Sequence, residues 1–158
     1  GLLPGDDVHG VAFAPAGLRL VVTRESAAHV LSDPHAAEGV VYPYSVDWAS
    51  AATFVPGADL AVVASGRFLY FINPVRADRP RRVKTGGRIS CLAASPDGRV
   101  VLAGGRQGAV EVYDTASRGR TTAYDFGLGG LHALAFAPDG LTFAAAGDKG
   151  LVVCDADG

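Results

Sequence analysis

The stretch ISCLAASPDGRVVLAGGRQGAVEVYD, residues 89–114, consists of three short apolar runs separated by two turn signals. The first run ends at Pro-Asp-Gly, residues 96–98, where the proline ring fixes φ and Asp-Gly suits a tight turn. A glycine-rich stretch, residues 104–108, separates the second run from the third. Because the third run, residues 109–113, is rich in β-branched and aromatic residues, the whole stretch predicts three strands joined by two turns.

The same pattern occurs four times along the chain. The segments VAFAPAG, ATFVPGA, LAASPDG and LAFAPDG each contain a proline, and successive prolines lie 41, 40 and 42 residues apart: Pro15, Pro56, Pro96 and Pro138. An Asp or Asn that ends an apolar run recurs at spacings of 40, 41 and 41 residues: Asp33, Asn73, Asp114 and Asp155. The two series have nearly the same spacing, so the whole chain of 158 residues is predicted to consist of repeats of 40–42 residues.

The same pattern predicts strands at 60–64 and 68–72 in the second repeat and at 141–146 and 151–154 in the fourth. The first three repeats add a fourth, more polar strand, at 40–42, 82–85 and 121–124. Short length and charge suit such a strand to the outer edge of a sheet, where they prevent further strand addition. No fourth strand follows residue 154, so the last unit is predicted to be incomplete.

Four short strands in each unit of this length resemble the blades of the WD-repeat β-propeller family. The phrases around Pro96 and Pro138 are similar to the family's repeat opening, and an acid or amide stands at each place of its closing Trp-Asp pair. The Trp itself and the family's Gly-His pair are absent, and only Asp148 matches its buried aspartates. The resemblance implies an all-β fold of four-stranded antiparallel blades, here packed mainly by apolar contacts between sheets; a related propeller family is the alternative.

A blade buries both faces only between two neighbours, so four blades are few for a complete ring. We expect a single propeller segment over residues 1–158, with approximate repeats 8–43, 44–87, 88–129 and 130–158. The missing initial Met favours further blades outside this sequence, and a second chain is another way to complete the ring. The weaker option is a closed ring of four blades, in which residues 2–3 supply the last outer strand.

Composition limits the partners. The net charge of −2 and pI near 6.1 do not favour nucleic-acid binding, which requires a strongly basic face. No apolar run approaches the roughly 20 residues of a membrane-spanning helix, and the first residues do not resemble a secretory signal, so we expect no membrane partner and favour a soluble, cytoplasmic protein. Cys91 and Cys154 lie in apolar runs and are expected to be buried rather than disulfide-bonded.

The family resemblance implies that a protein partner docks on the loops between one blade's outer strand and the next blade's inner strand. The candidates there lie eight or six residues before the prolines: Trp48, Arg88, His9, Ser50, Ser90 and His132. The four residues at the second position are polar in every repeat, which predicts a ring of hydrogen-bonding groups, although a solvated start of the strand explains them too. For Trp48, an interface anchor and packing against the adjoining blade are both open.

Positive residues cluster in one segment: Arg76, Arg79, Arg81, Arg82 and Lys84. This basic patch suits an acidic or phosphate-bearing partner, but charge that keeps an exposed edge strand soluble is the favoured interpretation. No metal-ligand spacing, G-x-S-x-G elbow, P-loop or dinucleotide fingerprint occurs, so no catalytic residue, metal or cofactor is predicted.

These observations favour a non-catalytic propeller that acts as a protein-interaction scaffold. The first alternative is a channel-centred enzymatic propeller, similar to lactonases, in which residues such as Asp7, Asp47, His9 and His132 hold a metal ion. The second is a sensor segment attached to a kinase or protease domain. The sequence does not identify the partner.

Overall fold

All regular structure in the described part of the chain is β-strand, as predicted. The computed structural model describes residues 7–14, 20–24, 28–31, 40–41, 49–73 and 79–157. Within them, fifteen strands form four antiparallel sheets, and each sheet takes its strands from one continuous part of the chain. We call the sheets blades 1 to 4.

The strands of each blade pair in chain order. Blade 1 holds β1 (Val8–Phe13), β2 (Leu20–Arg24), β3 (Ala28–Leu31) and β4 (Val40–Val41). Blade 2 holds β5 (Ala49–Phe54), β6 (Ala61–Ser65), β7 (Phe68–Ile72) and β8 (Arg81–Lys84). Blade 3 holds β9 (Ile89–Ala94), β10 (Val100–Gly105), β11 (Ala109–Asp114) and β12 (Arg120–Asp125). Blade 4 holds β13 (Leu131–Phe136), β14 (Thr142–Gly147) and β15 (Gly150–Asp155), with no fourth strand among the described residues.

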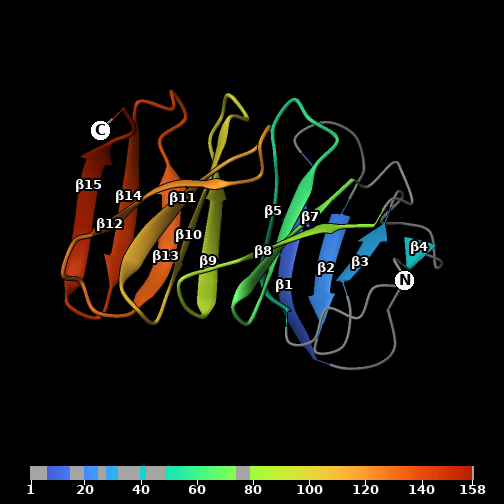
Figure 1. The fold of residues 1–158 in the computed structure, drawn as a ribbon, viewed down its shortest axis with the longest axis horizontal. Coiled ribbons are helices and arrows are strands. Elements are labelled where there is room, and N and C mark those ends of the chain that lie inside the picture. Colours follow the sequence, from blue (N-terminus) through green and yellow to red (C-terminus); the bar gives the residue numbers. More distant parts are fainter. Residues whose placement is uncertain are drawn as a thin grey trace.

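The blades stand side by side along the longest axis of the molecule (Figure 1). Neighbouring blades contact each other chiefly through their first strands, β1 with β5, β5 with β9, and β9 with β13. The last strands, β8 and β12, form the opposite edges of their sheets from the first strands. First strands gathered on one side and last strands on the other are the arrangement of consecutive propeller blades.

Three apolar clusters fill the spaces between blades. Because successive side chains of a strand point to opposite faces of the sheet, one strand can contribute to the clusters on both sides of its blade. On β7, Tyr70 and Ile72 pack against the cluster between blades 1 and 2, whereas Leu69 and Phe71 belong to the cluster between blades 2 and 3. The predicted packing of sheet against sheet is therefore present. Both cysteines are free, with Cys91 buried and Cys154 half-buried in the cluster between blades 3 and 4.

The turns after the first strands also join neighbouring blades. Gly98 has a φ of 73°, and a Cβ added to it would lie 2.2 Å from the Pro56 carbonyl oxygen of the preceding blade. Only glycine satisfies both the left-handed backbone and this close approach. Gly140 occupies the same turn position in blade 4, with a φ of 74°, but an added Cβ would lie 3.5 Å from Pro96, an ordinary contact distance.

The two end blades expose apolar residues that inner blades bury. Leu69 and Val110 lie four residues before the repeated Asn or Asp and are 0% exposed, whereas Leu151, at the same position in β15, is 65% exposed. Val153 is 61% exposed, and at the other end of the row Val11 and Phe13 of β1 are 56% and 65% exposed. Both ends of the described row therefore present the type of surface that is buried between blades.

Candidate interaction face

One end of the blades is built from the loops that precede each first strand and the turns between second and third strands. Backbone hydrogen bonds join the two kinds of loop: Ile89 N–H to Gly66 O at 3.0 Å, Arg106 N–H to Arg88 O at 3.3 Å, and Asp148 N–H to Gly130 O at 3.0 Å. We call this end, formed by residues 66–67, 85–88, 106–108, 126–130 and 148–149, the Arg106 face. The opposite end, which carries the turns after the first strands, is the Asp97 face.

A pocket of about 270 Å³ opens on the Arg106 face and is lined by Ser50, Gly66, Arg88, Ile89, Ser90 and Arg106. The structure thus brings together three of the six residues predicted as partner-binding candidates, Ser50, Arg88 and Ser90. Sequence reasoning missed Arg106. The sequence feature that could have identified Arg106 is its place in the turn between β10 and β11, because the loop beside that turn carries the predicted candidate Arg88.

Ser50 and Ser90 connect adjacent blades. The Ser50 hydroxyl donates to the Ile89 carbonyl at 2.6 Å, and the Ser90 hydroxyl donates to the Leu131 carbonyl at 2.8 Å. The two bonds are equivalent in the repeat: each donor lies six residues before the proline of its own blade, and each acceptor lies seven residues before the proline of the next blade. At these two predicted positions each hydroxyl proton is given to the neighbouring blade, and only the oxygen lone pairs remain for a ligand.

His132, the residue at the same position in blade 4, pairs within its own blade. Its Nε2 lies 2.5 Å from Asp148 Oδ1, and Asp148 Oδ2 accepts the Gly130 N–H at 2.8 Å. The bond from His132, followed by that from Gly130, lowers the pKa of the Asp148 carboxyl below its ordinary value. Asp148, the single match to the family's aspartates, holds the loop before β13 against the turn before β15.

Blade 3 uses a buried carboxylate for a similar purpose. Glu111 is 5% exposed; its Oε1 accepts the Gly86 N–H at 2.7 Å and contacts Arg120 Nη1 at 3.3 Å, and its Oε2 accepts the Tyr113 hydroxyl at 2.6 Å. Burial, followed by the bond to Glu111, raises the pKa of the Tyr113 phenol. Thr85 donates to the Gly87 carbonyl at 2.7 Å. These bonds fix the loop that carries Arg88.

The basic patch lies on the outer side of blade 2, in and just before β8. The described members Arg79, Arg81, Arg82 and Lys84 are all exposed. Arg82 lies over the Phe68 ring at 4.5 Å, which shields an aromatic side chain of β7. This placement agrees with charge on an exposed edge strand. The structure does not bring the patch into the pocket with Arg88 and Arg106.

Three predicted candidates lie outside the part of the chain that can be described. Trp48 and Arg76 fall between the described ranges, and for His9 the structure describes the backbone in β1 but not the side chain. Among the described residues, no three His, Cys, Asp or Glu side chains are grouped as metal ligands. Nor does this part of the chain contain a helix long and apolar enough to span a membrane.

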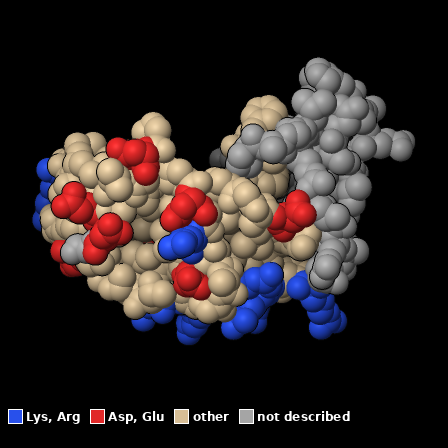
Figure 2. All heavy atoms as spheres, turned by 90° about the horizontal axis from the view of Figure 1, so that it is seen from above, with Lys and Arg blue, Asp and Glu red and all other residues tan. Residues whose placement is uncertain are grey.

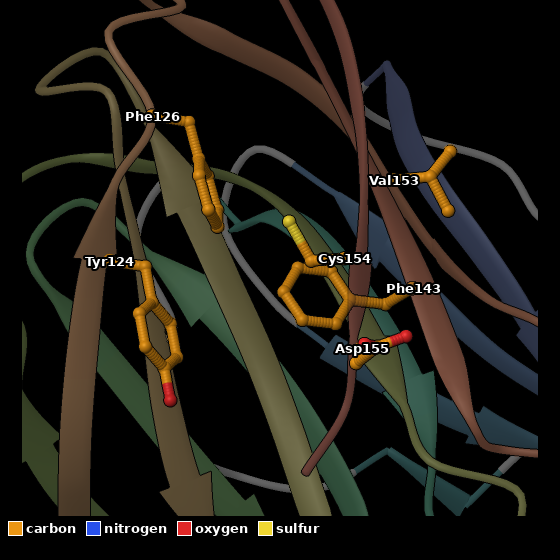
Figure 3. Close-up of a pocket in the computed structure, with 6 residues that line it drawn as sticks. All are labelled: Tyr124, Phe126, Phe143, Val153, Cys154 and Asp155. Carbon is orange, nitrogen blue, oxygen red and sulfur yellow. The ribbon is translucent and has the colours of Figure 1, made fainter. Parts of the chain in front are cut away.

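A second pocket, of about 440 Å³, lies between the end of blade 3 and β15 (Figure 3). It is lined by Tyr124, Phe126, Phe143, Val153, Cys154 and Asp155. Tyr124 and Phe126 are stacked with ring centroids 6.0 Å apart, and Phe143 is tilted against Phe126 at 6.3 Å. The apolar pocket borders β15, the strand that has no outer partner among the described residues.

Comparisons with known proteins agree with this architecture. The WD40 family, described as "WD domain, G-beta repeat", matches residues 80–114. The Serine-threonine kinase receptor-associated proteins of Bos taurus and Homo sapiens are 26% and 25% identical to the chain over 101 residues, which cover 64% of the chain and 29% of each relative. The match thus spans less than a third of the length of these curated relatives.

Kuenenia stuttgartiensis Hydrazine Synthase has a similar fold, with a TM-score of 0.85 and 17% sequence identity over 95% of this chain and 46% of that chain. At this identity the likeness concerns the fold alone. Together with the repeat and the family match over residues 80–114, it supports a β-propeller fold with WD-repeat-like blades. Proteins of this class serve in general as platforms for protein–protein interaction.

Proposed function

We propose that this protein is a non-catalytic protein-interaction scaffold whose partner docks on the Arg106 face. The observation that carries the proposal is the convergence of predicted and unpredicted polar residues around one open pocket on this face, between blades 2 and 3. Arg88 and Arg106 are exposed there, on loops that hydrogen bonds hold in place. A fixed loop presents its side chains with little loss of conformational entropy on binding, which favours recognition.

The comparisons support a protein as the partner. The name of the relatives in Bos taurus and Homo sapiens states an association with a serine-threonine kinase receptor. We transfer from it only the class of partner, a protein, because the match covers 29% of each relative. Of the residues that the enzymatic alternative proposes as metal ligands, Asp47 and the side chain of His9 lie outside the described residues, and His132 is bonded to Asp148.

A further blade is the proposed occupant of each exposed apolar end of the row. The reason is continuity: positions that inner blades bury against a neighbour are exposed on β15 and β1. The aromatic pocket beside β15 supports the same assembly, because β8 and β12 occupy the corresponding edge of blades 2 and 3. Such blades come either from further sequence or from a second chain.

Site-specific photo-crosslinking in cells tests the docking face. A photoreactive amino acid at Gln107, exposed on the Arg106 face, is expected to give a discrete adduct with a protein that mass spectrometry identifies and that binds the purified chain. The same amino acid at Ala116, exposed on the Asp97 face, is the matched control. Equal adducts from both positions, or none from Gln107, contradict the proposal.

A further inference from the structure

Two arginines are held next to each other on the Arg106 face. Arg88 and Arg106 line the same pocket, and the backbone bond from Arg106 N–H to Arg88 O joins them directly. The backbones pack so closely that a Cβ added to Gly105 would lie 1.6 Å from the Arg88 carbonyl oxygen. The distance between the backbones of Arg88 and Arg106 is therefore set by the fold.

The two guanidinium groups have no charge partner within the described structure. Both side chains are exposed, and neither forms an ion pair or a side-chain hydrogen bond with a described residue. No carboxylate lines the pocket. Three other described carboxylates near this face accept hydrogen bonds within the fold: Asp125 from the Gly127 N–H, Asp148 from Gly130 and His132, and the buried Glu111 from the Gly86 N–H. Asp7, just before β1, is the exposed carboxylate at this end of blade 1.

The opposite face is rich in acidic residues, although Arg99 and Arg118 lie in the same turns and Arg99 pairs with Asp97. Aspartates stand in its turns and at the strand ends that reach it: Asp59, Asp97, Asp114, Asp139 and Asp155. Figure 2 views this end of the molecule and shows acidic side chains spread over it, with basic side chains both among them and along the edges. The exposed guanidinium groups of Arg88 and Arg106 therefore favour the approach of an acidic segment to the Arg106 face over the aspartate-rich Asp97 face.

We propose that Arg88 and Arg106 bind the carboxylates of an acidic segment of a protein partner. Guanidinium groups present paired N–H donors that match a carboxylate. The pocket has no aromatic side chain on which a nucleic-acid base can stack, which favours a peptide over a single-stranded nucleic acid. This inference rests on the proposed docking face and adds the chemistry of the partner.

Peptide binding to the purified chain tests the inference. The probe is a fluorescein-labelled peptide of about twelve residues that alternates Asp and Glu with Gly and Ser; the comparison peptide replaces each acid by its amide. The acidic peptide is expected to bind. We expect Arg88→Gln or Arg106→Gln to weaken it roughly two- to five-fold, and the double variant roughly ten-fold, as for exposed ion pairs.

Arg79→Gln with Arg81→Gln is the matched control, since it removes the same charge from the exposed outer side of blade 2. An equal loss in this control, or equal binding of the amide peptide, overturns the inference. Tighter binding of a phosphoserine peptide or of single-stranded DNA also overturns it in favour of a phosphate site. The crosslinking at Gln107 does not depend on peptide charge. If a partner is crosslinked there but the acidic peptide does not bind, this inference is rejected while the proposed docking face is still supported.

Discussion

At the scale of single residues, the repeat places equivalent side chains in equivalent geometry. Ser50 and Ser90 stand six residues before Pro56 and Pro96, and each donates to a carbonyl of the following blade. A serine hydroxyl is short enough to bond across the contact between two first strands. His132 has no such carbonyl among the described residues and bonds Asp148 instead.

Gly98→Ala is expected to destabilise the fold more than Gly140→Ala. Both substitutions place a side chain at a φ above 70°, which costs about 1–2 kcal/mol. In Gly98→Ala the Cβ also meets the Pro56 carbonyl at 2.2 Å, so blades 2 and 3 must separate, whereas at Gly140 there is room. Urea denaturation of the two variants measures the difference, and equal losses contradict a role for Gly98 in blade contact.

At the scale of strands, alternation decides which side chains join which blades. Along β7 and β11, apolar side chains face both neighbours, so both faces of blades 2 and 3 are buried. Along β15, Val152 and Cys154 pack inward while Leu151 and Val153 remain exposed. The strand sequence is thus suited to a blade that has a neighbour on each side.

Leu151→Asp with Val153→Asp tests whether this face docks a blade. Because both side chains are exposed, the free energy of unfolding is expected to stay within about 0.5 kcal/mol per site of wild type. Wild type is expected to bind 1-anilino-8-naphthalenesulfonate and to self-associate with concentration in sedimentation velocity, and the variant to do both less. Thr122→Asp, on exposed β12, controls for added charge. Unchanged dye binding and sedimentation in the double variant reject the docking face.

At the scale of the whole molecule, hydrogen-bonded aspartates stabilise both faces. Bonds to Asp97 from Ser95, to Asp114 from the Ser117 N–H and to Asp148 from His132 lower the pKa of each carboxyl from 3.8. A folded-state pKa below the unfolded value means that the stabilisation is complete above the unfolded pKa. It is lost as the pH falls through the folded-state pKa.

The fold is therefore expected to lose stability as the pH falls below about 4. Asp148→Asn should reduce the free energy of unfolding at pH 6 and differ less from wild type at pH 3, which lies below the ordinary pKa that this carboxyl has in the unfolded chain. Urea titrations at the two pH values give both differences. Asp157→Asn, which changes an exposed carboxylate, is the control. A constant difference between Asp148→Asn and wild type at both pH values contradicts the linkage.

The amino-acid sequence by itself determined the all-β class, the four repeats and most strand positions, because these depend on local alternation and on turn residues that recur every 40–42 positions. It predicted the bounds of β7, residues 68–72, as the structure has them. It also placed Ser50, Arg88 and Ser90 as candidates. Only the tertiary structure decided what these residues contact. The bonds from Ser50 and Ser90 and the meeting of Arg88 with Arg106 depend on how separate strands and loops come together in space, which no local pattern encodes.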